Sequence, residues 1–339
     1  MGSSETVHNY SYDLLRIIAI LCVIFNHTKQ YGYELYTVAT DPYSRYGSLL
    51  LGMVCKIGVP LFLMVSGALL LGKDESVRTV MKKRVLPFAV IFAVMFLLQY
   101  LRVSRANGFE GLSVSGYLRC LLYDDPIAPY WFLRSYLIFL ITLPFLRAIA
   151  RQMNRDLFYL LLALQTAVMV LQYVNAVTGI TNSFSFFVLN SFVFYPLAGY
   201  WLSENREKCM PLLRILIPAA VLLLIGSTII LANESPAITS LEPYTGAVWI
   251  IAFAVFELVN RIFVTRGKTV VKELGSCVFG VYLIEDILRN RLEFLVPLLG
   301  RGIGSLNACL IYVLLVFSAC AVLVWIGRKI PGVRFFLHS

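Results

Sequence analysis

Long apolar stretches, each of about 20 residues, limit the folds that are open to this chain. A helix of that length spans about 30 Å, which is the thickness of the hydrocarbon core of a bilayer. Lipid offers no hydrogen-bond partners to the backbone, so these spans have to be helical. The alternating ten-residue pattern of a transmembrane β-barrel is absent. The ten candidate spans are residues 12–31, 49–71, 85–101, 131–150, 157–177, 185–202, 212–232, 245–264, 277–299 and 307–327.

The composition agrees with a membrane protein. Hydrophobic residues make up 59% of the 339 residues and charged residues 14%, whereas a soluble domain has about 45–50% and ~25%. These values exclude a cytosolic globular enzyme, a disordered chain and a collagen-like fibre. We expect an all-α polytopic membrane protein in which residues 1–339 form a single transmembrane domain.

The formal net charge of +10, from 29 basic and 19 acidic residues, has two interpretations. In a soluble protein it would suggest binding to nucleic acid. With the N-terminus placed in the cytoplasm, however, most of the basic residues fall in cytoplasmic loops, as the positive-inside rule requires. We therefore expect both termini in the cytoplasm and no nucleic-acid partner. The seven cysteines show no CxxC motif and no Cys/His cluster with metal-ligand spacing, so we expect no metal site.

The first span carries Arg16 and His27 among its ionisable residues. They are eleven residues apart, so in a helix their directions differ by about 20° and their positions by ~16 Å along the axis. Ionisable groups inside a membrane are costly and usually face a polar cavity. The alternative is that Arg16 extends to the lipid headgroups and His27 lies at the interface.

Histidine is the natural general base near neutral pH, and it could remove the proton from a hydroxyl so that the oxygen attacks an activated carbonyl. The chain has three histidines, and His8 and His338 lie outside the predicted spans. A histidine that acts inside the membrane therefore has to be His27.

Five motifs in this chain, in the same order, resemble those of membrane acyltransferase family 3. The hallmark is the Arg-x10-His pattern, here preceded by Asp13. The motifs are Asp13-x-x-Arg16-x10-His27, the stretch GVPLFLMVSGALL at 58–70, Lys82-Lys83-Arg84-Val85-Leu86-Pro87, Tyr130-Trp131-Phe132-Leu133, and Ser276-x5-Tyr282-Leu283-Ile284.

The resemblance implies about ten helices and transfer of an acyl group, commonly acetyl from acetyl-CoA, to a hydroxyl of an extracytoplasmic glycan. It implies that His27 is the catalytic histidine and that Arg16 is its partner in the motif. The expected partners are cytoplasmic acyl-CoA, a cell-envelope glycan or lipid-linked acceptor, and the lipid bilayer of a bacterial plasma membrane. Many members have a histidine where this chain has Glu285, followed by Asp286. Glu285 either orients His27 or binds the acceptor, or it pairs with Arg289 four residues later.

The basic stretch Lys82, Lys83 and Arg84 lies at the predicted cytoplasmic mouth of the third span. Coenzyme A carries phosphates, which Lys and Arg bind well, so these residues are candidates for donor binding. The alternative is an ordinary positive-inside cluster. There is no phosphate-binding loop motif to support nucleotide hydrolysis.

Two residues of the fourth span are further candidates for the donor site. Arg134 lies inside the span, where a charge needs a partner. Trp131 either lines an acyl tunnel or belongs to an interfacial aromatic belt. In the second span, we expect Ser66 and Gly67 to serve close helix packing. The alternative is a nucleophilic Ser66, for which the sequence shows no neighbouring base.

A second hypothesis from another class remains open at this point. A membrane transporter or flippase for a small polar solute or glycan precursor would also use ten helices and a buried Arg and His. No inverted repeat is visible in the sequence, although many transporters have one.

Overall fold

The computed structural model describes residues 8–108, 112–123, 130–179, 184, 186–205, 210–233, 247–262 and 268–337. Within these ranges the regular secondary structure is entirely helical, which confirms the predicted all-α class for the described part of the chain. The chain forms two compact units, which are described separately. Unit 1 contains residues 1–68 and 153–339, and unit 2 contains residues 69–152.

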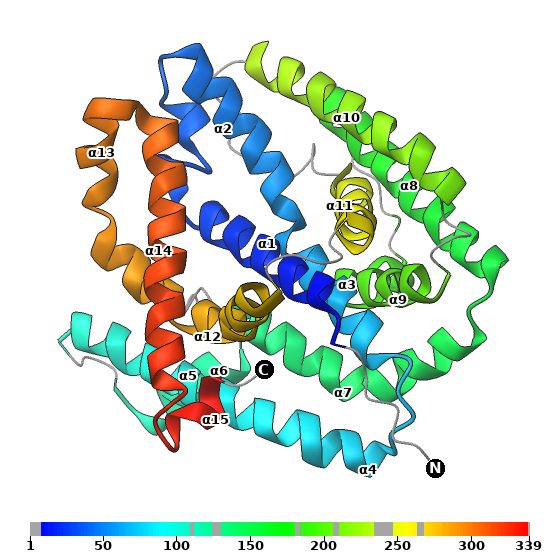
Figure 1. The fold of residues 1–339 in the computed structure, drawn as a ribbon, viewed down its shortest axis with the longest axis horizontal. Coiled ribbons are helices and arrows are strands. Elements are labelled where there is room, and N and C mark those ends of the chain that lie inside the picture. Colours follow the sequence, from blue (N-terminus) through cyan, green and yellow to red (C-terminus); the bar gives the residue numbers. More distant parts are fainter. Residues whose placement is uncertain are drawn as a thin grey trace. The chain divides into compact units, whose positions relative to one another are not determined.

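Unit 1 contains most of the helices, and α1 is its central element (Figure 1). α1 packs against α11, α12 and α14. The helices are α1 (Tyr10–Asn26), α2 (Pro42–Val54), α3 (Gly58–Leu70), α8 (Arg155–Thr178), α9 (Ser191–Glu204), α10 (Met210–Asn233), α11 (Val248–Ile262), α12 (Lys268–Leu292), α13 (Leu295–Ile303), α14 (Ser305–Gly327) and α15 (Val333–Leu337).

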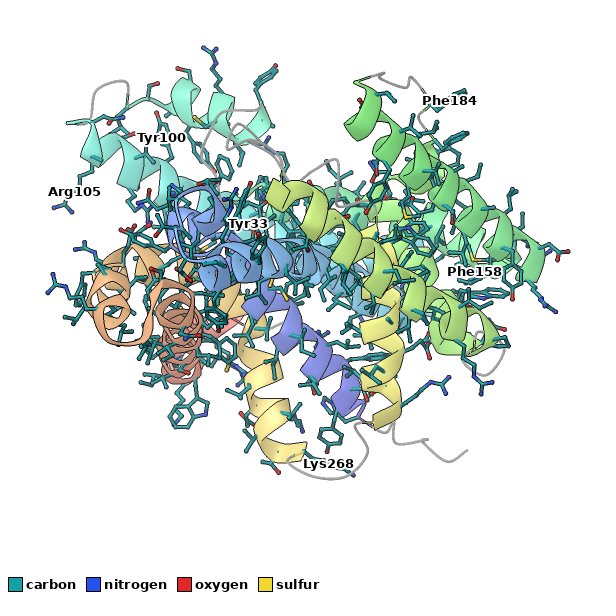
Figure 2. The ribbon with its side chains drawn as sticks, turned by 90° about the horizontal axis from the view of Figure 1, so that it is seen from above. Tyr33, Tyr100, Arg105, Phe158, Phe184 and Lys268 are labelled. Carbon is teal, nitrogen blue, oxygen red and sulfur yellow. The ribbon has the colours of Figure 1, made fainter. Side chains whose placement is uncertain are left out.

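The helices α1 and α12 lie side by side and run in the same direction. Near their starts, a Cβ atom on Gly275 would lie 2.4 Å from the Cβ of Asp13, so that only glycine allows this contact. Lys268 is the first residue of α12 (Figure 2). Its ammonium lies 5.5 Å from the centre of the Tyr10 ring at the same end of α1. Near the other end of α1, His27 contacts Glu285. The close approach of the two backbones at Gly275 thus sets which residues of α12 meet α1.

The helix α14 runs antiparallel to α12. Tyr312, in the first half of α14, donates a hydrogen bond to the backbone oxygen of Arg289 late in α12. At the other end, Arg328 donates to the hydroxyl of Ser276. These relative directions of α1, α12 and α14 are those that the ten-span prediction requires for its first, ninth and tenth spans.

The helices α3 and α9 cross with their backbones in contact. A Cβ atom on Gly67 would lie 2.0 Å from the backbone oxygen of Pro196, and one on Gly199 would lie 2.2 Å from that of Met64. The predicted packing role of Gly67 is therefore confirmed. The hydroxyl of Ser66 donates a 2.8 Å hydrogen bond to the backbone oxygen of Phe62, one turn earlier in the same helix.

Unit 2 begins with one long helical stretch that contains a wide turn. The stretch consists of α4 (Val77–Val80), a π-helical turn (Met81–Val85) and α5 (Leu86–Ala106). Pro87 stands in the first turn of α5 and has no N–H to continue the preceding α-helical ladder, which accounts for a wide turn before it. Two further helices, α6 (Val114–Leu122) and α7 (Trp131–Gln152), complete the unit.

Part of the expected outer loop, residues 102–130, is helical. α5 continues to Ala106, and α6 follows after a short connection. Tyr100 joins the two helices, because its hydroxyl accepts a hydrogen bond from the backbone N–H of Ser113 and donates one to the oxygen of the same residue (Figure 2). Tyr117 of α6 donates a 2.9 Å hydrogen bond to the backbone oxygen of Ala93.

Five helical stretches of the described chain are long and apolar enough to cross a membrane by length and composition. They are Pro42–Leu70, Val77–Ala106, Trp131–Gln152, Arg155–Asn175 and Ser305–Gly327. The chain is thus an α-helical membrane protein, while the full set of ten spans and the cytoplasmic location of both termini remain predictions. Several helices begin or end several residues from the predicted boundaries. The predicted span 277–299 joins the end of α12 to the first part of α13, and α12 itself begins at Lys268, because apolar content alone signals neither the end of a helix nor a break between two helices.

Candidate active site

The helix α1 positions both Arg16 and His27. It is unbroken from Tyr10 to Asn26, and His27 follows as its C-cap with helical backbone angles. The eleven-residue spacing therefore places Arg16 and His27 on nearly the same face, ~16 Å apart along the axis. The Arg16 side chain is 29% exposed and that of His27 is 26% exposed.

The imidazole of His27 is bound by a fully buried carboxylate from α12. Its Nδ1 lies 2.6 Å from Oε1 of Glu285, whose side chain is 0% exposed. An ionised carboxylate can only accept hydrogen bonds, so a neutral imidazole that makes this contact carries its proton on Nδ1 and its lone pair on Nε2. A partly exposed imidazole with a carboxylate at Nδ1 is the arrangement that an oriented general base requires.

Glu285 contacts Arg289 as well as His27, so the two alternatives drawn from the sequence occur together. Oε1 faces the imidazole, and Oε2 lies 3.5 Å from Nε of Arg289. Arg289 also donates a 2.7 Å hydrogen bond to Oδ1 of Asp286. The predicted pair at i and i+4 and the contact with His27 therefore belong to one buried cluster of charges.

Arg16 has an acidic partner in the same helix. Its Nη1 lies 3.5 Å from Oδ1 of Asp13, and Nε2 of His8 lies 2.5 Å from the other carboxylate oxygen of Asp13. Asp13 is buried under α12 at Gly275. His8, outside the predicted span, therefore helps to hold the carboxylate that contacts Arg16.

The predicted donor-binding residues Lys82, Lys83 and Arg84 lie in the π-helical turn of unit 2. The two lysines are exposed. Arg84 instead binds Glu75 through two hydrogen bonds, Nε to Oε2 at 2.9 Å and Nη2 to Oε1 at 2.7 Å. Arg147, which is buried, donates to Oε2 of the same carboxylate at 2.8 Å.

Arg84 and Arg147 together hold Glu75 ionised. The hydrogen bond from Arg84, and after it that from Arg147, lower the pKa of Glu75 to about 2 although its partial burial raises it. Arg147 also donates to the backbone oxygen of Leu70 at the end of α3. These hydrogen bonds stabilise the turn between α3 and α4, and they engage the guanidinium of Arg84. The exposed Lys82 and Lys83 are therefore better candidates for binding a phosphate than Arg84.

Arg134 of α7 finds its partners on the backbone of α6. Its Nη2 donates hydrogen bonds of 3.1 Å to the oxygens of Cys120 and Tyr123, at the C-terminal end of α6. A cation at this position satisfies carbonyls that the helix leaves unpaired and complements the helix dipole. Trp131, the first residue of α7, is 52% exposed and contacts the ring of Phe132 edge to face. Its role in a tunnel or in a belt remains a prediction.

Some contacts of the site could not be predicted from the sequence. Tyr312 approaches Arg289 from another helix, and no local spacing signals this. The i, i+3 spacing of Asp286 and Arg289 was visible as a potential ion pair, and the structure forms it at 2.7 Å. Asp124 and Asp125, which could bind sugar hydroxyls, lie outside the described residues.

Comparison with known proteins gives one result. A family model described as an acyltransferase domain, that of acyltransferase family 3, matches residues 9–328, which is nearly the whole chain. No curated protein and no solved structure matches the chain significantly.

Proposed function

Because the chain belongs to acyltransferase family 3 and is an acyltransferase, we propose that it transfers an acyl group, acetyl in the first instance, from cytoplasmic acyl-CoA to a hydroxyl. The proposed acceptor is a glycan of the bacterial cell envelope or a lipid-linked precursor of one. The proposed location is the plasma membrane. Membership of a family of acyltransferases argues against the alternative that the chain is a transporter or flippase.

The 2.6 Å contact between His27 Nδ1 and Glu285 Oε1 is the observation that carries this proposal. With Nδ1 protonated, Nε2 is the atom that receives the proton of the acceptor hydroxyl. The hydroxyl oxygen then attacks the thioester carbonyl, so that a C–O bond forms. Glu285 stabilises the imidazolium that results, in a buried environment where its charge acts strongly.

The second half of the reaction returns the proton. The C–S bond of the tetrahedral intermediate breaks, the sulfur leaves as a thiolate, and Nε2 of His27 gives it the proton. The products are the ester and coenzyme A, and His27 and Glu285 regain their original states. In this proposal Arg16 holds part of the donor or stabilises charge at the cytoplasmic end of α1, and Lys82 and Lys83 bind phosphates of the donor.

Thiol release from acetyl-CoA by the purified protein in nanodiscs, with and without envelope glycans, tests this function. His27→Ala should lower kcat by about 10²- to 10⁴-fold, the usual contribution of general-base catalysis. His338→Ala provides the matched control and should keep wild-type activity. If His27→Ala retains full transfer activity, His27 is not the base.

A further inference from the structure

The second carboxylate oxygen of Glu285 has one charged neighbour. Oε2 of Glu285 and Nε of Arg289 are both buried, and neither has a hydrogen-bond partner among the described residues. They lie 3.5 Å apart, so that each is the other's ion-pair partner. Buried charges without a partner are costly, and active-site hydrogen bonds are often long before a substrate binds.

Arg289 is itself held from two helices. Its Nη2 donates a 2.7 Å hydrogen bond to Oδ1 of Asp286, and the same oxygen accepts a 3.3 Å hydrogen bond from Nδ2 of Asn290. Tyr312 of α14 donates to the backbone oxygen of Arg289. The side chains of Arg289 and Asp286 are each 11% exposed. The guanidinium therefore has a defined place beside Glu285.

The contacts of this cluster fix the position of the Glu285 carboxylate. One of its oxygens faces the imidazole of His27, and the other lies 3.5 Å from Nε of Arg289, whose guanidinium is held by Asp286. Without Arg289, the buried Oε2 would lose the charged neighbour beside it, and a buried charge that loses its partner is costly. The carboxylate would then turn towards another donor, and Oε1 would no longer lie in place to accept the Nδ1 proton of His27.

We propose that Arg289, held by Asp286, is a positioning residue for acyl transfer: it keeps the Glu285 carboxylate in the orientation that holds His27 with Nε2 free. This inference rests on the proposed function of His27 as the base. It adds Arg289 and Asp286 to the residues on which the reaction depends, and both act through Glu285.

The kinetic test uses the full-length protein in nanodiscs with acetyl-CoA as the probe. Arg289→Gln should lower kcat by about 10- to 100-fold, as expected for a misplaced catalytic group, and should leave the KM for acetyl-CoA within about 2-fold. Arg289→Lys should restore part of kcat because it keeps the charge. Arg291→Gln, an exposed arginine of the same helix, is the matched control and should behave as wild type.

Nitrogen NMR of ¹⁵N-histidine-labelled protein gives a readout that does not depend on activity. The chain has three histidines, so variants of His8 and His338 assign the signals of His27. We expect a protonated Nδ1 and an unprotonated Nε2 in the wild type, and loss of this pattern in Arg289→Gln. An unchanged pattern in that variant, or unchanged kcat, would overturn the proposal.

One further outcome distinguishes a failure of this proposal from a failure of the function on which it rests. If His27→Ala and the wild type release thiol equally fast, the proposed function fails, and the NMR pattern still decides whether Arg289 holds Glu285 and His27.

If Arg289→Gln does not fold, Asp286→Asn replaces it. That variant should lower kcat several-fold and alter the same His27 signals, and wild-type behaviour in both measurements would contradict the role of the cluster.

Discussion

His27 and Glu285 are separated by 258 positions in the chain, yet Nδ1 of one lies 2.6 Å from Oε1 of the other. The carboxylate comes from α12, which runs parallel to α1 and approaches it closely at Gly275. Because Glu285 is fully buried, its charge acts on the imidazole with little screening by water.

Glu285→Gln should lower kcat for acetyl-CoA turnover by about 10²-fold, because the neutral amide no longer stabilises the imidazolium or requires a proton on Nδ1. Initial rates of thiol release measure this. Glu273→Gln, an exposed residue of the same helix, serves as the control. Full activity of Glu285→Gln would show that the carboxylate does not support the base.

Replacing Lys82 and Lys83 together by Gln should raise the KM for acetyl-CoA by about 3- to 10-fold and leave kcat nearly unchanged, because two exposed charges each contribute less than about 1 kcal/mol to binding a phosphate. The effect should shrink as salt is added. Steady-state kinetics at low and high salt measure it. Arg155→Gln, another basic residue of the predicted cytoplasmic side, should leave KM unchanged, and an equal rise in both variants would indicate a non-specific charge effect.

Gly67→Ala and Gly199→Ala should each destabilise the protein by about 1–3 kcal/mol, because the added methyl group would collide with the backbone of the crossing helix. Thermal unfolding in detergent measures the change. In Gly226→Ala the new methyl group meets no atom within 4 Å. That variant should be neutral or gain about 0.5–1 kcal/mol from better helix propensity. Equal melting temperatures in all three variants would contradict the close crossing.

Stability should depend on pH through Glu75. Its pKa is lowered from 4.5 to about 2 by Arg84 and Arg147. A lowered pKa in the folded state stabilises the protein fully above the unfolded value, and this stabilisation is lost as the pH falls from about 4.5 towards 2. Melting temperatures from pH 7 to pH 3 should therefore fall more steeply in the wild type than in Glu75→Gln. Parallel curves would show that Glu75 does not contribute.

Helix periodicity by itself determines that Arg16 and His27 lie on nearly the same face of α1. The backbone hydrogen bonds of a helix are local, so the directions of side chains along one helix follow from the sequence alone. The helical class and the family resemblance could be recognised for the same reason, since apolar runs and short motifs are read from neighbouring residues. The ends of the helices were less predictable, as the extension of α5 and the short α6 show, because they depend on caps and contacts with other segments.

The partners of these residues were decided by the tertiary structure. In the sequence, Glu285 was equally compatible with Arg289 and with His27, and the packing of α12 on α1 brings it to both. Arg84 was a candidate for binding phosphate like its two neighbours, and Glu75 distinguishes it from them. Arg134 required a partner, and the end of α6 supplies one. Which side chains meet across helices depends on how closely two backbones approach, and at Gly275, Gly67 and Gly199 that approach is possible because these residues lack a side chain.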